Sequence, residues 1–152
     1  MIRELSRAKV YERLLSELSL REEFYRAELA RLQESKSADT KSSAGDKFET
    51  SREMIAQEIA KVDHSLQTLI SNRKFMEEFA DQEVSETVRN GSIIRVGDQL
   101  FLLGVSLGEM DLGLEKIFLL SRSSPFGKIL FGLKKNDPVQ FMGKPNQINE
   151  IL

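Results

Sequence analysis

Two carboxylates stand three positions apart, at Asp46 and Glu49, in the sequence Gly45-Asp46-Lys47-Phe48-Glu49. Mg²⁺ is a hard cation that binds oxygen ligands, and it often takes only one or two protein carboxylates. In two-metal hydrolysis, a second ion about 3.5–4 Å from the first clamps the attacking and leaving oxygens. If the pair lies at the tip of a long helical hairpin, it would recruit such an ion inside a partner's active site.

The same pair has a structural interpretation. Asp-x-x-Glu ahead of an apolar heptad resembles a capping box, in which the two residues begin a helix. Negative charge at this position also favours the helix dipole. The spacing alone favours this interpretation. The two interpretations overlap, because one acid can cap the helix while the other faces outward.

Two long amphipathic segments flank the pair. Residues 2–35 contain no Gly or Pro and are rich in good helix formers. Their apolar seam is interrupted by one charged residue and comprises Tyr11, Leu15, Leu18, Glu22, Tyr25, Leu29 and Leu32. A second seam, with a 3.5-residue period, comprises Phe48, Arg52, Ile55, Ile59, Val62, Leu66, Leu69, Arg73, Met76 and Ala80. The sequence therefore predicts an antiparallel coiled coil with a tip loop near residues 36–47.

A different pattern follows residue 80, where short apolar stretches alternate with turn residues. Strands are predicted at residues 92–96, 99–105 and 116–120, with the glycine-bearing segment 107–113 as a separator. A short helix is predicted between Ser124-Pro125 and Gly132. A last hairpin, Val139–Met142 and Gln147–Leu152, is predicted to turn across residues 143–146.

The predicted class is α+β, with an antiparallel coiled-coil hairpin followed by a small sheet domain. The predicted boundaries are 1–80 for the hairpin, 81–90 for a linker and 91–152 for the sheet domain. The sheet domain is near the lower size limit for a core that is stable by itself.

Composition excludes several classes of function. The chain has no cysteine, which excludes disulfides and thiolate chemistry and fits a reducing cytoplasm. Net charge is −2 and neither half is basic, so we expect no strong independent binding of nucleic acid. No apolar run is long enough for a membrane helix, and the charged N-terminus is not a signal peptide. The single histidine, His64, is predicted to be an exposed surface residue.

Several motifs recur in one known family. They are Gly45-Asp46-x-x-Glu49, Gly91-Ser92, and the series Ser124-Pro125, Gly132, Lys134, Asp137 and Val139. In their order and spacing, over most of its length, the chain resembles the Gre transcript-cleavage factors of bacterial RNA polymerase, GreA and GreB.

This resemblance implies a fold and a function. The C-terminal domain would be FKBP-like and would dock at the rim of the polymerase secondary channel, while the coiled coil passes down it. Asp46 and Glu49 would help hold a Mg²⁺ ion shared with the polymerase and position a water molecule. The backtracked RNA 3′ end would then be hydrolysed. The chain would be an accessory factor, with no cofactor of its own, and not a stand-alone enzyme.

Five further residues are candidates for partner binding. They are Arg52, Ser124, Pro125, Phe126 and Lys134. Arg52 is one turn from the acids, Phe126 is an apolar anchor, and Lys134 belongs to a locally basic region that would face an acidic patch. Each also has a structural interpretation, as a snorkelling side chain, a helix start, a core residue or a solvated charge.

Three other functions stay open. Thr50, Ser51 and Arg52 follow the acids where the family often has acidic residues and a tyrosine, so a channel-binding regulator that does not cleave is one alternative. A coiled-coil adaptor is another. A prolyl isomerase is a third, although the chain lacks the tryptophan that floors the proline pocket in those enzymes. The sequence leaves the oligomeric state open.

Overall fold

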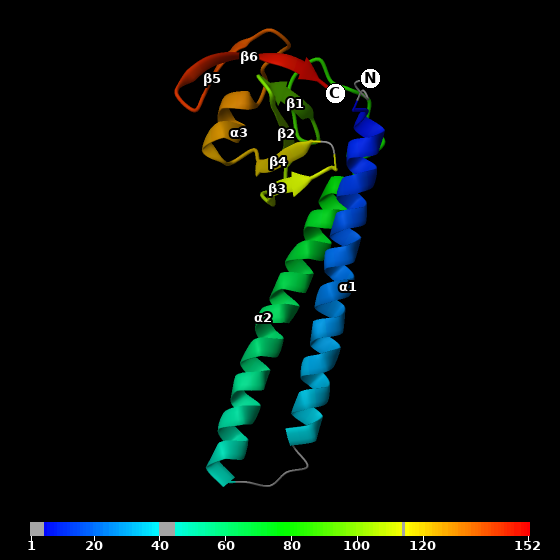
Figure 1. The fold of residues 1–152 in the computed structure, drawn as a ribbon, viewed down its shortest axis with the longest axis vertical. Coiled ribbons are helices and arrows are strands. Elements are labelled where there is room, and N and C mark those ends of the chain that lie inside the picture. The colour runs from blue at the N-terminus through cyan, green and yellow to red at the C-terminus, as the bar shows by residue number, and fades with distance from the viewer. Residues whose placement is uncertain (1–4, 40–44, 114) are drawn as a thin grey trace. The chain divides into compact units, whose positions relative to one another are not determined.

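The computed structural model describes residues 5–39, 45–113 and 115–152, leaving out the side chains of residues 39 and 45–48. Figure 1 shows two long helices followed by a sheet with one short helix, which confirms the predicted α+β class. The chain divides into two compact units, Ser16–Arg73 and Met1–Leu15 with Lys74–Leu152. The beginning of the first long helix and the end of the second therefore belong to the same unit as the sheet.

The two long helices are α1 (Arg7–Asp39) and α2 (Gly45–Glu77), each of 33 residues. At 1.5 Å per residue, each is about 50 Å long. Helix α1 ends four residues after the predicted end at residue 35, because Lys36, Ser37 and Ala38 include no helix breaker. Helix α2 begins three residues before the predicted start at residue 48.

The predicted seam is the buried face of this hairpin. Buried residues in the unit Ser16–Arg73 are Leu18, Leu32, Val62, Leu66 and Leu69. The two charged residues at seam positions meet each other, since Glu22 Oε2 lies 3.1 Å from Arg73 Nε. Arg31 is also attracted by Glu58. Contacting residues on α2 therefore have lower numbers as those on α1 have higher numbers, so the two helices are antiparallel. Arg73 thus pairs with the one charged residue of the facing seam.

We expect the Glu22 contact to make the hairpin sensitive to acid. The hydrogen bond from Arg26 and the charge of Arg73 hold the pKa of Glu22 below its ordinary value of 4.5. The stabilisation is present above that value and is lost as pH falls through the lower pKa of the folded state. In urea unfolding between about pH 6 and pH 3, Glu22→Gln should lose less stability than the wild type. Glu53→Gln, at an exposed position of α2, should follow the wild-type curve; coincident curves for all three proteins would contradict this role.

The sheet has six strands in the order β3-β4-β2-β1-β6-β5. The strands and the short helix, in chain order, are β1 (Ile93–Val96), β2 (Gln99–Gly104), β3 (Gly108–Asp111), β4 (Lys116–Ser121), α3 (Pro125–Leu130), β5 (Pro138–Phe141) and β6 (Lys144–Ile151). Strands β2 and β4 are parallel and the other pairs are antiparallel.

Two features of the sheet differ from the prediction. Strand β3 was predicted as part of a separator because its four residues contain a single apolar side chain, Met110. Met110 is nevertheless buried, and β3 pairs with β4 along its length. The last turn is Met142-Gly143 and not residues 143–146, because Phe141 pairs with Lys144. Both turn residues have positive φ, 52° and 74°, as a two-residue type I′ turn requires.

Both faces of the sheet are covered. On one face α3 packs against the sheet, in a core formed by Val88, Ile94, Val96, Phe101, Leu103, Leu120, Leu130, Val139 and Ile148. On the other face, alternate strand residues such as Leu100, Leu102 and Leu119 are also fully buried. On this face Met76 of α2 fills the space beside Gly104. A Cβ atom added at Gly104 would lie 2.6 Å from the Met76 sulfur. The end of α2 is therefore part of the sheet domain's core.

Arg7 and Tyr11 join the root of α1 to three other segments of this unit. The Arg7 guanidinium donates to the carbonyls of Gly91 at 2.7 Å, Phe79 at 2.6 Å and Leu152 at 3.4 Å. The Tyr11 hydroxyl donates to the same Gly91 carbonyl at 2.7 Å, and its ring lies 4.7 Å below the guanidinium. The segment after α2, the strand entry at Gly91 and the C-terminal residue are thus held around the Arg7 guanidinium.

The buried hydroxyl predicts a loss of stability in alkali. Burial raises the pKa of Tyr11 from 10.0 to about 12. The neutral hydroxyl stabilises the fold fully below pH 10, and the stabilisation declines as pH rises towards 12. Between these values the wild type should lose roughly 2–3 kcal/mol that Tyr11→Phe does not lose. Tyr25→Phe, on the same helix, is the control in denaturant unfolding at both pH values; equal losses in all three proteins would contradict the assignment.

Candidate functional site

The predicted acidic pair lies in the first two turns of α2. The helix begins at Gly45, so Asp46 is within the first turn and not at the N-cap position expected of a capping box. Helical positions three apart are neighbours on the helix surface. Glu49 is exposed, and the side chain of Asp46 is outside the described residues.

The described part of this site consists of the Glu49 side chain. Glu49 is exposed and forms no ion pair with another described residue. Among the described residues there is no group of three or more His, Asp or Glu side chains that would hold a metal ion. A donor set of one or two carboxylates suits Mg²⁺ when water and a second macromolecule supply the other oxygens.

Arg52 follows Glu49 by three positions on α2. It was predicted at a seam position, yet its side chain is exposed, whereas Ile55, the next seam residue, is half-buried. The Arg52 side chain is therefore not packed between the two helices. The Arg52 side chain lies about one helical turn after Glu49 and is accessible to a partner.

Ser124 and Pro125 begin α3, as predicted. The Ser124 hydroxyl accepts a hydrogen bond from the Gly127 N–H at 3.1 Å and donates to the Ser121 carbonyl at 2.6 Å. Pro125 occupies the first turn, where its missing N–H costs nothing. Phe126 is half-buried, with its ring centroid 5.0 Å from Phe101. These residues thus have structural roles, while Pro125 stays exposed.

Lys134 lies in the turn after α3. Its N–H donates to the Asp137 carboxylate at 2.8 Å, and its backbone forms a bridge with Thr87. The two motif residues Lys134 and Asp137 therefore fix this turn through backbone contacts. The ammonium group of Lys134 is exposed.

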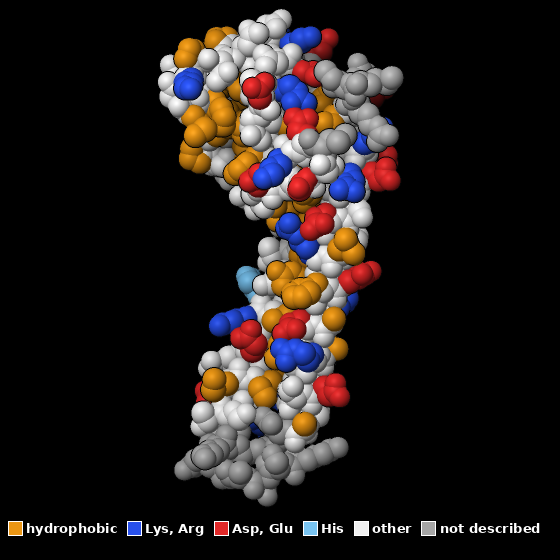
Figure 2. All heavy atoms as spheres, viewed as in Figure 1, with side chains coloured by type: hydrophobic (Ala, Val, Ile, Leu, Met, Phe, Trp, Pro, Cys, Tyr) orange, Lys and Arg blue, Asp and Glu red, His pale blue; other side chains and the backbone are white. Residues whose placement is uncertain are grey.

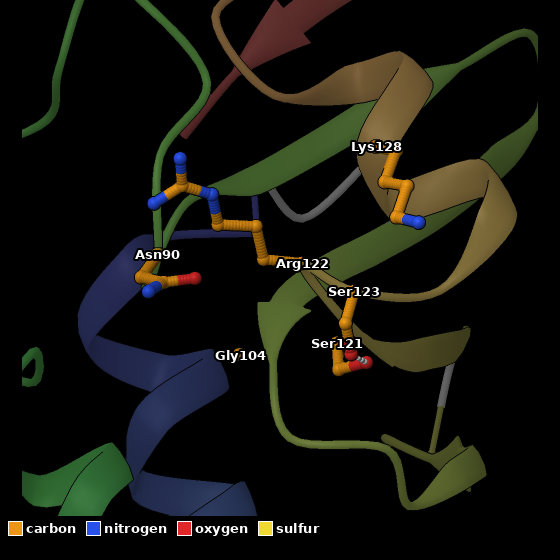
Figure 3. Close-up of a pocket in the computed structure, with 6 residues that line it drawn as sticks. All are labelled: Asn90, Gly104, Ser121, Arg122, Ser123 and Lys128. Carbon is orange, nitrogen blue, oxygen red and sulfur yellow. Dashed lines mark hydrogen bonds between the residues drawn. The ribbon is translucent and has the colours of Figure 1, made fainter.

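An open pocket of about 440 Å³ lies beside Ser124. Its lining residues are Asn90, Gly104, Ser121, Arg122, Ser123 and Lys128. Figure 3 shows Arg122 extending towards Asn90 and Lys128 extending away from it on α3. The Arg122 guanidinium lies 3.7 Å from the centroid of Phe131, and the Ser121 and Ser123 hydroxyls are 3.0 Å apart. The Arg122 and Lys128 side chains do not converge, so the pocket carries two separate positive charges at its open edge.

Three exposed apolar residues were not predicted as functional. They are Phe118, 42% exposed, Ile129, 51% exposed, and Met142, 84% exposed. Figure 2 shows hydrophobic side chains gathered at the edge of the sheet domain that carries α3 and the β5–β6 turn. Sequence periodicity assigned all three to strands or a helix without indicating their exposure. The one available signal was the glycine after Met142, which is typical of a two-residue turn.

No family model matches the chain, and no curated protein matches it. A solved structure of the transcription factor Gfh1 is 21% identical and covers 99% of both chains, with a TM-score of 0.34. A structure of GreA factor homolog 1 (Gfh1) from Thermus thermophilus is 18% identical and covers 91% of this chain and 94% of that chain, with a TM-score of 0.32.

Neither long helix, within the residues that the structure describes, is apolar enough to cross a membrane.

Proposed function

We propose that this chain is a transcription elongation factor that binds the secondary channel of bacterial RNA polymerase and stimulates cleavage of backtracked RNA. One observation carries the proposal. Gly45-Asp46-x-x-Glu49 begins the second of two antiparallel 33-residue helices, directly after residues 40–44, which connect them. The motif series from Ser124 to Val139, in the order found in Gre factors, supports it.

The length of the helices would allow the two carboxylates to enter a partner. Helix α2 has 33 residues, so it extends for about 50 Å from its start at Gly45. Asp46 and Glu49 would hold a Mg²⁺ ion jointly with the polymerase and accept hydrogen bonds from the attacking water. When bound, that ion supplies positive charge that stabilises the developing charge of phosphodiester hydrolysis. Arg52, one turn further along α2, would orient RNA or the polymerase.

The sheet domain would provide the docking contact. Pro125 and Lys134 are exposed, and Phe126 is accessible in part, while Ser124 fixes the start of α3 beneath them. The Lys134 ammonium suits an acidic patch on the polymerase. In this proposal the factor acts in the cytoplasm, contacts the nascent RNA 3′ end indirectly and completes an active site that belongs to the polymerase.

Stalled, backtracked complexes of the cognate polymerase test this function. The chain is added with Mg²⁺, and both polymerase binding and RNA length are measured. Binding with shortened RNA is the expected result. Binding without shortened RNA would favour a channel-binding regulator that does not cleave. Absence of binding would contradict the proposal and favour an adaptor.

A further inference from the structure

Helix α1 carries a second stripe, on a face other than the seam that packs against α2. Leu20 is 58% exposed and Phe24 is 66% exposed, whereas the seam residues Leu18 and Leu32 are buried. The neighbours of Leu20 and Phe24 on this face recur at steps of three and four residues, the spacing of a helix-to-helix contact. We call the following five residues the outer stripe of α1: Glu17, Leu20, Phe24, Ala27 and Arg31.

An open pocket lies on this stripe. It measures about 420 Å³ and is lined by Glu17, Leu20, Arg21, Phe24 and Tyr25. The Phe24 and Tyr25 rings meet edge to face, with their centroids 5.8 Å apart. The pocket therefore combines apolar and aromatic side chains with one carboxylate, that of Glu17. A long side chain with an apolar stem and a cationic end suits such a pocket.

A second copy of α1 supplies such a side chain when it lies antiparallel, with its Ala27 level with Phe24. The small Ala27 side chain leaves room for the Phe24 ring, and two-fold symmetry repeats the contact. Arg31 of the copy then comes level with Leu20. Its apolar stem covers Leu20 and its guanidinium reaches Glu17.

The charges beside the stripe favour this antiparallel pairing. Glu17 and Arg21 form one ion pair, at 3.3 Å, and Glu28 and Arg31 form another, at 2.5 Å. In the pairing, Arg21 lies within one turn of Glu28 of the copy, and Glu17 lies within one turn of Arg31 of the copy. A like-charge contact between Glu17 and Glu34 of the copy opposes it at the ends of the stripe. A parallel pairing would instead set Glu17 beside Glu17 and Arg31 beside Arg31.

We propose that the outer stripe of α1 associates with the same stripe of a second copy of this chain, as an antiparallel two-fold dimer. The stripe spans about 21 Å along the helix, which is short for a stable interface, so the dimer is weak and depends on concentration. A two-fold contact uses the same surface on both copies, so association stops at the dimer. It needs no polymerase, so this inference and the proposed function stand or fall separately.

Sedimentation velocity of the full chain tests the dimer. The wild type should be monomeric at about 5 µM, and its dimer fraction should rise towards about 500 µM. Phe24→Gln should raise the dissociation constant of the dimer at least about tenfold, because the aromatic anchor is lost. Met54→Gln is the matched control, since Met54 is 65% exposed on α2 in the same unit but lies outside the stripe. It should dimerise like the wild type, and circular dichroism should show equal helix content in all three proteins.

Charge reversal tests the antiparallel pairing. Arg31→Glu should abolish the dimer, because it sets an acid against Glu17 of the copy. Adding Glu17→Arg to that variant should restore the dimer, because the two opposite charges are then exchanged. Glu34→Gln alone should strengthen it.

Three outcomes would overturn the inference. A wild type that stays monomeric at the highest concentration would exclude the dimer. Equal weakening by Phe24→Gln and Met54→Gln would exclude this face of α1. A monomeric Glu17→Arg/Arg31→Glu variant would exclude the antiparallel pairing.

Discussion

Replacing Asp46 with Asn and Glu49 with Gln in one variant is expected to slow RNA cleavage in backtracked complexes roughly a hundredfold. Asn and Gln keep the size of the side chains and remove the negative charges that attract a divalent cation. The loss should be greatest at low Mg²⁺ and should shrink as Mg²⁺ rises, because mass action offsets a weaker site. Polymerase binding by the sheet domain should change little.

Glu53→Gln is the matched control for this variant. Glu53 is exposed on α2, one turn beyond Glu49, so the change removes one carboxylate from the same helix, whereas the double variant removes two. It should leave the cleavage rate within about twofold of the wild type, since exposed charges act weakly across screened distances. Wild-type cleavage by the double variant would show that the pair only begins the helix.

Gly127→Ala is expected to have the largest effect on stability, about 3 kcal/mol or more. A Cβ atom at Gly127 would lie 2.0 Å from the backbone oxygen of Ser121 and 2.8 Å from the Ser124 hydroxyl. The backbone oxygen cannot move without displacing the end of β4, and the hydroxyl cannot move without losing the N-cap of α3. Denaturant unfolding of the full chain measures the change.

Gly132→Ala separates steric conflict from backbone strain. Gly132 has φ of 85°, and no atom lies within 4 Å of the position that its Cβ would take. That variant should cost only about 1–2 kcal/mol, the ordinary penalty for a non-glycine residue in the left-handed region. Equal losses for the two variants would contradict the close contact at Gly127.

Periodicity predicted the helices well because their packing is local and repetitive. The seam residues Leu18, Leu66 and Leu69 are buried as predicted, since a 3.5-residue period admits one antiparallel arrangement. The pairing of Glu22 with Arg73 was not predicted. Each interrupts its own seam, and only the register between the two helices shows that they meet.

The sheet domain was less predictable, because tertiary contacts decide its details. Strand β3 has one apolar residue, so no alternation reveals it, and its pairing with β4 defines it. The predicted β5–β6 turn, residues 143–146, differs from the observed turn because Pro145 is typical of turns. It lies instead in the part of β6 that pairs with the edge strand β5, where a proline is tolerated.

The site was predictable in part, for a related reason. Motif order indicated Asp46, Glu49 and Ser124, and the structure places all three at helix starts. Exposure of Phe118, Ile129 and Met142 depends on which side chains cover them, and no local pattern encodes that. Only three-dimensional neighbours reveal the surface that they form.

A tethered iron chelate at position 49 tests the central claim most directly. The chain has no cysteine, so Glu49→Cys provides a unique attachment point. The labelled protein is bound to a backtracked polymerase complex, and hydroxyl radicals are generated. We predict cuts in the polymerase segments that line the active site and in RNA near its 3′ end. Cuts confined to the outer surface of the polymerase, or no cuts despite binding, would contradict delivery of these carboxylates to the active site.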